Sequence, residues 1–452
     1  MELTEKLRTG EWREKLKKAN LDLIPLKMAG KLIDNPYLDA IRRCFFRMMP
    51  FLLAVSFMDI IVTVFLSPDG FILGSRWLNL GFWLTGGLTG EEYQQHHIMV
   101  TLVSFRHVVS MGYGILSLVL VLSMSHKLAK LWEIDKVATT FCALTAYMFM
   151  LPPADMANQA AVVDYFAERR FFAAFFSAFA ASALFAFFCG QKKLRMPPFP
   201  RQNGDLGYFL DMTIPISLTL SVFAILALVT ETFNFAPERL MQATTSLPTF
   251  QLLPVALLYQ LVVWLLWWFG IPGYGFTSAV ERYAYVSAQT GNQLGDTAYV
   301  FTSGFFEAGM MHAVALIIAV MVFSRHQTWR KVAKWCLPLT IFNMQEAVAF
   351  GLPVVFNPLF LVPYVLAPLA NTAVGYVAIS WGIVPVFQTT VPWTMPVLVN
   401  GILGTGSYMG GMLQLVWLVM DIFIYAPFVL LANVVELNED NQESGGKRGD
   451  KK

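Results

Sequence analysis

Long apolar runs separated by short polar segments dominate the pattern of hydrophobic and polar positions along this chain. Six runs approach the length of about 20 residues that a helix needs to cross the hydrocarbon core of a bilayer. They are Cys44–Leu66, Thr101–Ser125, Phe171–Gly190, Met212–Thr230, Gln251–Ile271 and Met412–Ala432. This pattern predicts an all-α polytopic membrane protein with about ten transmembrane helices in total.

Composition supports the same class, and the placement of charge adds an orientation. The 452 residues are 56% hydrophobic and 14% charged, whereas soluble proteins carry roughly a quarter charged residues. Basic residues gather in Met1–Arg43, His126–Lys136, Gln191–Arg201 and Arg325–Lys334, while Ser67–Val100 holds a single one. Because basic loops stay on the cytoplasmic side of the membrane, we expect both termini to be cytoplasmic.

Polar segments suggest how the chain is divided. Residues 1–35 are predicted to form a basic amphipathic segment on the cytoplasmic membrane surface, or else a solvated cytoplasmic helix. Residues 36–435 form the transmembrane domain, in which the basic, proline-rich sequence QKKLRMPPFPRQN separates N-terminal helices (36–203) from a second half (204–435). The polar tail, residues 436–452, is expected to be disordered.

Glycine and proline recur inside apolar sequence in the second half, at FGIPGYG, AFGLPVVFNP, VPYVLAPLAN and VPWTMP. Backbone groups that such breaks free from a helix are costly in lipid, so irregular chain survives only inside protein or beside a wet cavity. Transporters place their binding sites in broken segments of this kind. The second half is therefore predicted to contain re-entrant, substrate-binding hairpins.

Glu346 lies in the break FNMQEAVAFGLP, between apolar flanks. An ionisable side chain at membrane depth costs at least about 2.5 kcal/mol, so it calls for a partner or a function. Pairing with an arginine, or capping a short helix that begins at Glu346, would be structural explanations. Asn343 and Gln345 add polar groups close by, which favours a hydroxyl-rich ligand such as a sugar, with Glu346 as a general base toward one hydroxyl.

The same residues resemble a known family. FNMQEAVAFGLPVVFNPLF is similar to the Asn-x-Asn-Glu-Pro signature, and the Phe-Gly-Leu-Pro and Asn-Pro sequences after it, in the membrane subunit EIIC of sugar phosphotransferase systems (PTS). VPWTMPVLVNGILGTG and QLVWLVMDIFIYAPF resemble later segments of the lactose/cellobiose branch, and PYLDAIRRCFFRMMPFLLAVSF its opening. The resemblance covers nearly the whole chain and is most specific in its C-terminal third.

This resemblance implies an EIIC-type fold, a homodimer in a bacterial cytoplasmic membrane, and a β-linked disaccharide as substrate. The phosphoryl group would come from the soluble subunit EIIB, which receives it from EIIA. In the family scheme the signature glutamate, here Glu346, binds the hydroxyl that becomes phosphorylated, and Asn343 matches the first signature asparagine. Trp393 lies at the Pro-Trp position, where it could face a sugar ring or serve as an interfacial aromatic anchor.

Departures from the family pattern concern the reacting groups. The family usually has Phe-Gly-Ile-His-Gly, whose histidine is held to assist at the reacting hydroxyl, but this chain has Pro272 there. Gln345 replaces the second signature asparagine, and Ala347 the signature proline. The sequence SGFFEAGMMHAVAL brings in Glu307 and His312; His312 either substitutes for the absent imidazole or makes a polar contact between helices.

Two further residues are candidates for binding. Arg106 and His107 lie early in an apolar run, where they could contact a ligand or phosphate, although snorkelling or an ion pair would also explain them. No cofactor, metal or nucleic acid is expected, and the absence of a GxxxxGK[ST] motif argues against ATP hydrolysis by this chain. The bilayer itself is the remaining expected partner.

Three functions follow from these residues. The first is an EIIC-type permease that moves a β-linked oligosaccharide of the cellobiose, chitobiose or lactose class and couples its movement to phosphorylation by EIIB. The second is a diverged EIIC-like membrane sensor that binds ligand without phosphoryl transfer, which Pro272 and Gln345 favour. The third is facilitated transport without phosphorylation. The permease is preferred because most of the site-bearing sequence is retained.

Overall fold

The fold is helical throughout the part of the chain that the structure describes. This computed structural model describes residues 36–151 (except 69, 71 and 75–77), 171–191, 194, 205–232 and 247–449. The predicted surface segment 1–35 and most of the proline-rich sequence near residue 195 lie outside these residues. No β-strand occurs within the described ranges.

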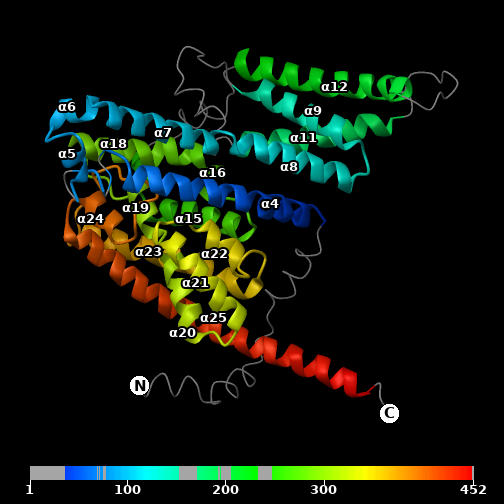
Figure 1. Ribbon diagram of the computed structural model, residues 1–452. Helices are drawn as coiled ribbons and strands as arrows, with labels where there is room; N and C mark the ends of the chain where they lie inside the picture. The colour runs from blue at the N-terminus through cyan, green and yellow to red at the C-terminus, as the bar shows by residue number, and fades with distance from the viewer. Residues whose placement is uncertain are drawn as a thin grey trace.

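Figure 1 shows the helices of the first half gathered along one side of the molecule. They are α4 (Pro36–Asp59), the π-helix η1 (Ile60–Phe65), α5 (Leu80–Leu84), α6 (Gly90–Gln95), α7 (His97–Gly114), α8 (Leu116–Leu131), α9 (Lys136–Met150), α11 (Phe171–Gly190) and α12 (Asp205–Thr232). Helices α8, α9 and α11 pack against one another, and α4 packs on α8. We call this group the N-terminal bundle; its core includes Phe45, Leu120 and Tyr147.

Helix α12 packs against α9 and α11 of the N-terminal bundle. It begins after residue 203, where the sequence suggests a division of the transmembrane domain. Helix α12 therefore packs with the first half of the chain. The boundary between the two halves, judged by packing, lies between α12 and the helix that begins at Leu247.

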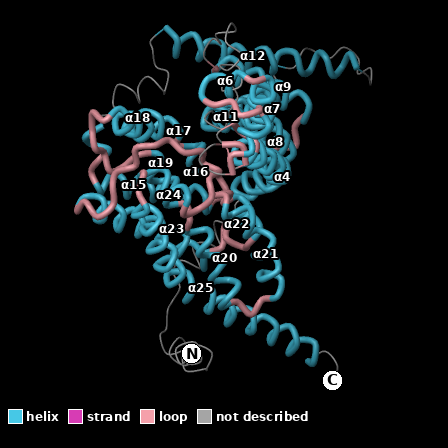
Figure 2. Tube along the Cα trace, turned by 60° about the vertical axis from the view of Figure 1, so that its left-hand side comes forward, coloured by secondary structure: helices cyan, strands magenta, loops and turns pink. Residues whose placement is uncertain are grey.

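The remaining helices form a second body, here called the C-terminal body (Figure 1). They are α14 (Leu247–Phe250), α15 (Leu253–Trp268), α16 (Gly273–Phe276), α17 (Ser278–Val280), the π-helix η4 (Glu281–Val286), α18 (Ser287–Leu294), α19 (Ser303–Gly309), α20 (His312–Phe323), α21 (Gln327–Ile341), α22 (Glu346–Gly351), α23 (Pro358–Ser380), α24 (Val399–Thr405) and α25 (Tyr408–Gly449). Figure 2 shows loops between the short helices of this body. Their common core is rich in buried aromatic rings, among them Trp264, Phe305 and Trp417.

Five helical segments within the described residues are long and apolar enough to cross a membrane. They are Phe172–Gly190, Asp211–Thr230, Ser303–Phe323, Pro358–Ser380 and Tyr408–Asn433. Three of them coincide with runs expected from the sequence. A further two of the expected runs fall on shorter apolar helices, Leu53–Phe65 and Leu253–Trp268.

The run Thr101–Ser125, expected to form one span, is not one uninterrupted helix. The chain is divided there between α7 and α8, with Ile115 at the junction. Gly112 and Gly114 lie immediately before the junction, and glycine lowers the stability of a helix interior by up to about 1 kcal/mol. The apolar run is therefore continuous in hydropathy but not in helical structure.

Most of the glycine- and proline-rich sequences interrupt the helices as expected. FGIPG separates α15 from α16, and residues 352–357 separate α22 from α23. The exception is VPYVLAPLAN, which α23 crosses without a break although it contains Pro363 and Pro368. Proline is tolerated inside membrane helices when neighbouring groups in the packed protein satisfy the carbonyls that it frees.

The last helix, α25, extends beyond its apolar part to Gly449. It thus includes residues 436–449, for which the sequence predicts disorder. Once a helix has formed, each added residue gains a backbone hydrogen bond without a new nucleation step, so an apolar span can extend into a polar segment.

The two bodies contact each other close to the irregular segment 342–345. Helix α22 packs on α4, and Met344 packs with Ile60 and Val64 of η1. The ring centroids of Phe276 on α16 and Phe172 on α11 are 5.1 Å apart. The break that contains Glu346 therefore lies at the junction of the two bodies.

Close packing of α23 against α19 and α25 gives a test of the fold. A Cβ atom on Gly375 would lie 2.6 Å from a ring carbon of Trp417 and 2.7 Å from one of Phe305. Because both rings are buried, we expect Gly375→Ala to lower the free energy of unfolding by about 1–3 kcal/mol, measured by thermal unfolding in detergent. The control is Gly309→Ala, whose Cβ would meet open space; equal effects of the two substitutions would contradict this packing.

Candidate functional site

Helix α21 ends in a tight turn that determines the conformation of the Glu346 segment. The amide of Asn343 donates to Thr340 O at 3.0 Å, and that of Met344 donates to Leu339 O at 3.3 Å. Asn343 has a φ of +63°. This is the left-handed residue of a Schellman motif, a position that asparagine tolerates better than most residues. The break therefore follows from local backbone chemistry as well as from the later proline.

Glu346 is the first residue of the short helix α22. This is the position that the capping explanation requires. The preceding residue, Gln345, is the N-cap and makes no capping bond with its side chain. The Glu346 residue as a whole is partly exposed, but its Oε2 atom is buried. A carboxylate thus points into the interior of a membrane protein at a helix break.

The Asn343 side chain joins this break to the Pro-Trp segment. Its Nδ2 atom donates to Trp393 O at 3.2 Å, and the amide of Val397 donates to Ile341 O at 2.9 Å. Asn343 is 3% exposed and its Oδ1 atom has no hydrogen-bond partner. The structure therefore brings Asn343 and Trp393 together and leaves one buried acceptor on the amide.

His312 lies beside Gln345, which places it next to the signature segment. It begins α20 after a two-residue break, Met310 and Met311, and its ring is fully buried. Nδ1 is 2.8 Å from the hydroxyl of Tyr425, and the Gln345 side chain faces the ring. Neither His312 Nε2 nor Gln345 Oε1 makes a hydrogen bond of normal geometry, so both retain the capacity to bind a polar ligand.

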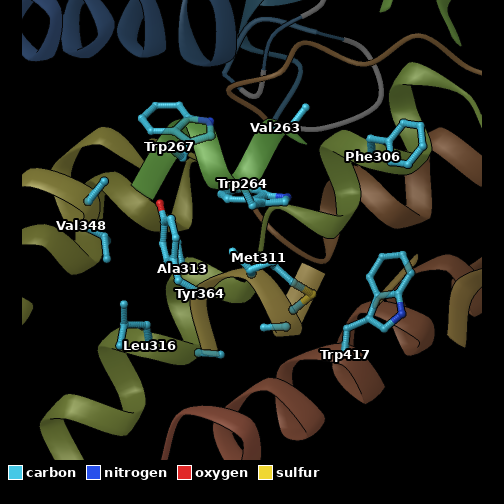
Figure 3. Packing of buried hydrophobic residues seen from close by; sticks show 14 of the residues in the cluster. Val263, Trp264, Trp267, Phe306, Met311, Ala313, Leu316, Val348, Tyr364 and Trp417 are labelled. Atoms are coloured by element: carbon cyan, nitrogen blue, oxygen red, sulfur yellow. The ribbon is translucent and has the colours of Figure 1, made fainter. Parts of the chain in front are cut away.

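Aromatic side chains from α15 and α23 enclose the His312 ring. The ring centroid of Trp264 is 4.2 Å from that of His312, and Tyr364 is 5.4 Å away, both edge to face. The charge of Glu346 also acts on the Tyr364 hydroxyl. Figure 3 shows Tyr364 with its hydroxyl oxygen turned toward the side of α15 that carries Trp264 and Trp267. These rings connect the carboxylate of Glu346 with the imidazole.

Pro272 occupies the N-cap of α16. Its segment lies against the break before α23, because the amide of Phe356 donates to Trp268 O at 3.0 Å and Trp268 Nε1 donates to Asn357 O at 2.9 Å. Gly273 must be small, since a Cβ there would lie 2.2 Å from Val263 O. The two breaks therefore support each other, but Pro272 contributes no polar side-chain group.

Arg106 is not part of this cluster. It is exposed on α7, and its charge acts on Asp59 at the end of α4. Asp59 is 8% exposed and accepts a hydrogen bond of 2.9 Å from the Thr63 hydroxyl. The structure therefore places Arg106 on the exposed side of α7, near enough to Asp59 for their charges to interact. The side chain of His107 lies outside the described part of the structure.

Glu307 and His312 are separated by the break between α19 and α20 and face different groups. The charge of Glu307 acts on Tyr274, and Glu281 acts on both of them. His312 faces Gln345 and Tyr425 instead. The two residues therefore do not form a pair.

The sequence interpretation overlooked a second buried polar group, formed by Asp421 and Asn371. Asn371 Nδ2 donates to Asp421 Oδ2 at 2.8 Å and to Gly309 O at 3.3 Å. Gln414 Nε2 donates to Ala308 O at 2.9 Å. A small cavity of about 10 Å³ borders this group, with Asn371 and Tyr274 among its lining residues. A single acid within the apolar run QLVWLVMDIFIYAPF was the available signal.

Metal binding has no support in the described residues, where no group of three or more His, Cys, Asp or Glu side chains could hold an ion. The chemistry available at the cluster is that of a carboxylate, two amides, an imidazole and several aromatic faces. Such a set suits recognition of hydroxyl groups and aliphatic ring faces.

Comparison with known proteins gives a consistent result. The chain is 26% identical over 446 residues to the PTS system oligo-beta-mannoside-specific EIIC component of Bacillus subtilis, covering 93% of this chain and 95% of that protein. It is 23% identical over 432 residues to the cellobiose-specific EIIC component of Geobacillus stearothermophilus, covering 89% and 91%. No family model matches the sequence.

A solved structure establishes the likeness in fold. The crystal structure of the transporter ChbC, the IIC component of the N,N'-diacetylchitobiose-specific phosphotransferase system, matches with a TM-score of 0.50 and 24% identity. The match covers 93% of this chain and 99% of that one. The chain is therefore similar along nearly its whole length to EIIC membrane components of sugar phosphotransferase systems in sequence, and to one of them in fold.

Proposed function

We propose that the protein is a sugar permease that moves a β-linked oligosaccharide across the cytoplasmic membrane and delivers it for phosphorylation by EIIB. The observation that carries this proposal is the Glu346 carboxylate, with Oε2 buried at a helix break and flanked by Asn343 and Gln345. The relatives are named for oligo-β-mannosides, cellobiose and diacetylchitobiose, so the substrate belongs to the cellobiose, chitobiose or lactose class.

Glu346 supplies the general base in this proposal. Its carboxylate accepts a hydrogen bond from one sugar hydroxyl and takes the proton as that oxygen attacks phosphorus on phosphorylated EIIB. A bond forms between the sugar oxygen and phosphorus, and the bond between phosphorus and EIIB breaks. A positioned base of this kind contributes about 10²- to 10⁴-fold in rate. EIIB would be rephosphorylated by EIIA.

His312 supplies the imidazole that Pro272 cannot. With Nδ1 against the Tyr425 hydroxyl, the ring is oriented so that Nε2 is available to a ligand beside Gln345. Trp267 Nε1 is buried without a hydrogen-bond partner and offers a donor from the same side. Asn343 and Trp393 complete the proposed binding set at the Pro-Trp segment.

The wider arrangement follows the same proposal. About ten transmembrane helices cross the bilayer, the broken segments of the C-terminal body form re-entrant hairpins, and both termini are cytoplasmic. Two chains associate as a homodimer. Residues 1–35 lie along the membrane surface, residues 36–435 form the transmembrane domain, and residues 436–452 form a cytoplasmic tail.

The sensor alternative rested on Pro272 and Gln345. In the proposed permease, His312 next to Gln345 supplies an imidazole that Pro272 does not, which answers the main chemical objection to phosphoryl transfer. The relatives that match along most of the chain are transport components, which favours the permease.

Reconstitution tests the proposed transport directly. Proteoliposomes that contain the full chain are supplied with phosphorylated EIIB inside and radiolabelled cellobiose, diacetylchitobiose or lactose outside. We expect sugar phosphate to accumulate inside with at least one of the three sugars, and only when EIIB is phosphorylated. Saturable sugar binding without any sugar phosphate would instead favour the sensor.

Substitution of Glu346 tests the assignment of the base. Glu346→Gln keeps the size of the side chain but cannot accept a proton, so we expect sugar phosphorylation to fall by about 100-fold or more with little change in thermal unfolding. Glu307→Gln changes a partly exposed carboxylate whose charge acts on Tyr274; it is the matched control and should retain activity. Unchanged uptake in Glu346→Gln would show that the base lies elsewhere.

Substitution of His312 distinguishes a site residue from a contact between helices. His312→Asn keeps a polar atom near Nδ1 for Tyr425 but removes Nε2. We expect sugar phosphorylation to fall by about 10- to 100-fold, while the protein remains folded in detergent. If phosphorylation were unaffected, His312 would serve only the packing of α20 against α25.

A further inference from the structure

A basic pocket lies far from the Glu346 break, on the N-terminal bundle. Its volume is about 480 Å³, and it is formed between α4, α8 and α9. Arg47 of α4 and Lys127 of α8 supply the positive charge, and His126 of α8 lines the pocket beside them. Arg47 and His126 are exposed, so the pocket opens to the surroundings of the protein. Nothing in the proposed transport chemistry uses it.

The basic side chains converge on one point although their charges repel. Arg47 and Lys127 both act electrostatically on the thiol of Cys44, which is buried, and Ser123 of the pocket lining also lies next to this thiol. None of the described lining residues is acidic. Like charges held together in this way favour an anion between them.

The part of the lining nearer the start of α8 is apolar. It is formed by Val119 and by Leu122, whose side chain is 40% exposed. Along α8, Val119 lies eight residues before Lys127, which is about 12 Å of helix. A bound molecule would therefore meet cations and hydroxyls at one end and hydrocarbon at the other. Inorganic phosphate would contact only the end with the cations and hydroxyls.

The position along the chain agrees with a membrane interface. His126 and Lys127 lie within the last two turns of α8, which ends at Leu131, and they begin the basic segment that the sequence predicts to be cytoplasmic. Basic pockets between transmembrane helices on the cytoplasmic side bind anionic lipid headgroups.

We propose that this pocket binds an anionic phospholipid, with Arg47, His126 and Lys127 around its phosphate and the Val119–Leu122 wall along its acyl chain. The Ser123 and Thr140 side chains line the pocket between them and provide hydroxyl donors for phosphate oxygens. The proposal is independent of the sugar site and would stand if the transport mechanism were different.

The test measures lipid binding to the full-length protein after delipidation, by native mass spectrometry with added phosphatidylglycerol or phosphatidylcholine. We expect selective retention of phosphatidylglycerol. Replacing both Arg47 and Lys127 with glutamine should weaken its binding by about 25-fold, since each basic side chain near a membrane surface is worth about fivefold in affinity. Lys130→Gln, an exposed basic residue on the same helix outside the pocket, should change it by less than about twofold.

A second variant keeps the charges and fills the apolar wall. Leu122→Trp should weaken phosphatidylglycerol binding while the thermal unfolding of the lipid-free protein stays unchanged. This variant still tests the proposal if the double variant folds poorly. Equal retention of the two lipids, or equal losses in Lys130→Gln and the double variant, would overturn the proposal. So would displacement of phosphatidylglycerol by millimolar inorganic phosphate, or occupation of the pocket by a second copy of the chain.

Discussion

Satisfaction of backbone hydrogen bonds in an apolar environment is the constraint on which the C-terminal body depends. A broken helix within a membrane leaves amides and carbonyls that only other parts of the protein can satisfy. Here the breaks satisfy one another: Phe356 N bonds to Trp268 O, and Val397 N bonds to Ile341 O. Buried side-chain amides complete the set, as Asn371 and Gln414 bond to carbonyls at the end of α19. Irregular chain is therefore stabilised where one break bonds to another and where buried amides bond to carbonyls at helix ends.

The same arrangement explains why a polar site forms at this place. Side chains at the breaks are held by their backbones, so several of their polar atoms stay without intramolecular partners. Asn343 Oδ1, Gln345 Oε1 and His312 Nε2 are buried acceptors or donors of this kind. Leaving such groups unsatisfied costs about 1–3 kcal/mol each, a penalty that a hydroxyl-rich ligand would relieve. Glu346 lies among them at the junction of the two bodies, where relative movement would change its access to either side.

Much of this could be predicted from sequence, because hydropathy, glycine and proline act locally. The helical class, the breaks at FGIPG and FNMQEAVAFGLP, and a short helix beginning at Glu346 follow from such signals. The contacts that assemble the site do not. His312 and Gln345 are 33 positions apart in the chain, and no local pattern indicates that α20 would place one beside the other. Pro363 and Pro368 mislead for a similar reason, since only the packed environment decides whether a proline interrupts a membrane helix.

The central claim is that the Glu346 carboxylate binds a sugar hydroxyl within these paired breaks. An experimental structure of the full chain with bound cellobiose or diacetylchitobiose tests it most directly. The account predicts a sugar hydroxyl at about 2.5–3.0 Å from a carboxylate oxygen of Glu346, with the sugar between the 342–346 segment and α15. A sugar bound elsewhere, with the Glu346 carboxylate paired to a basic side chain and no space beside it, would contradict it.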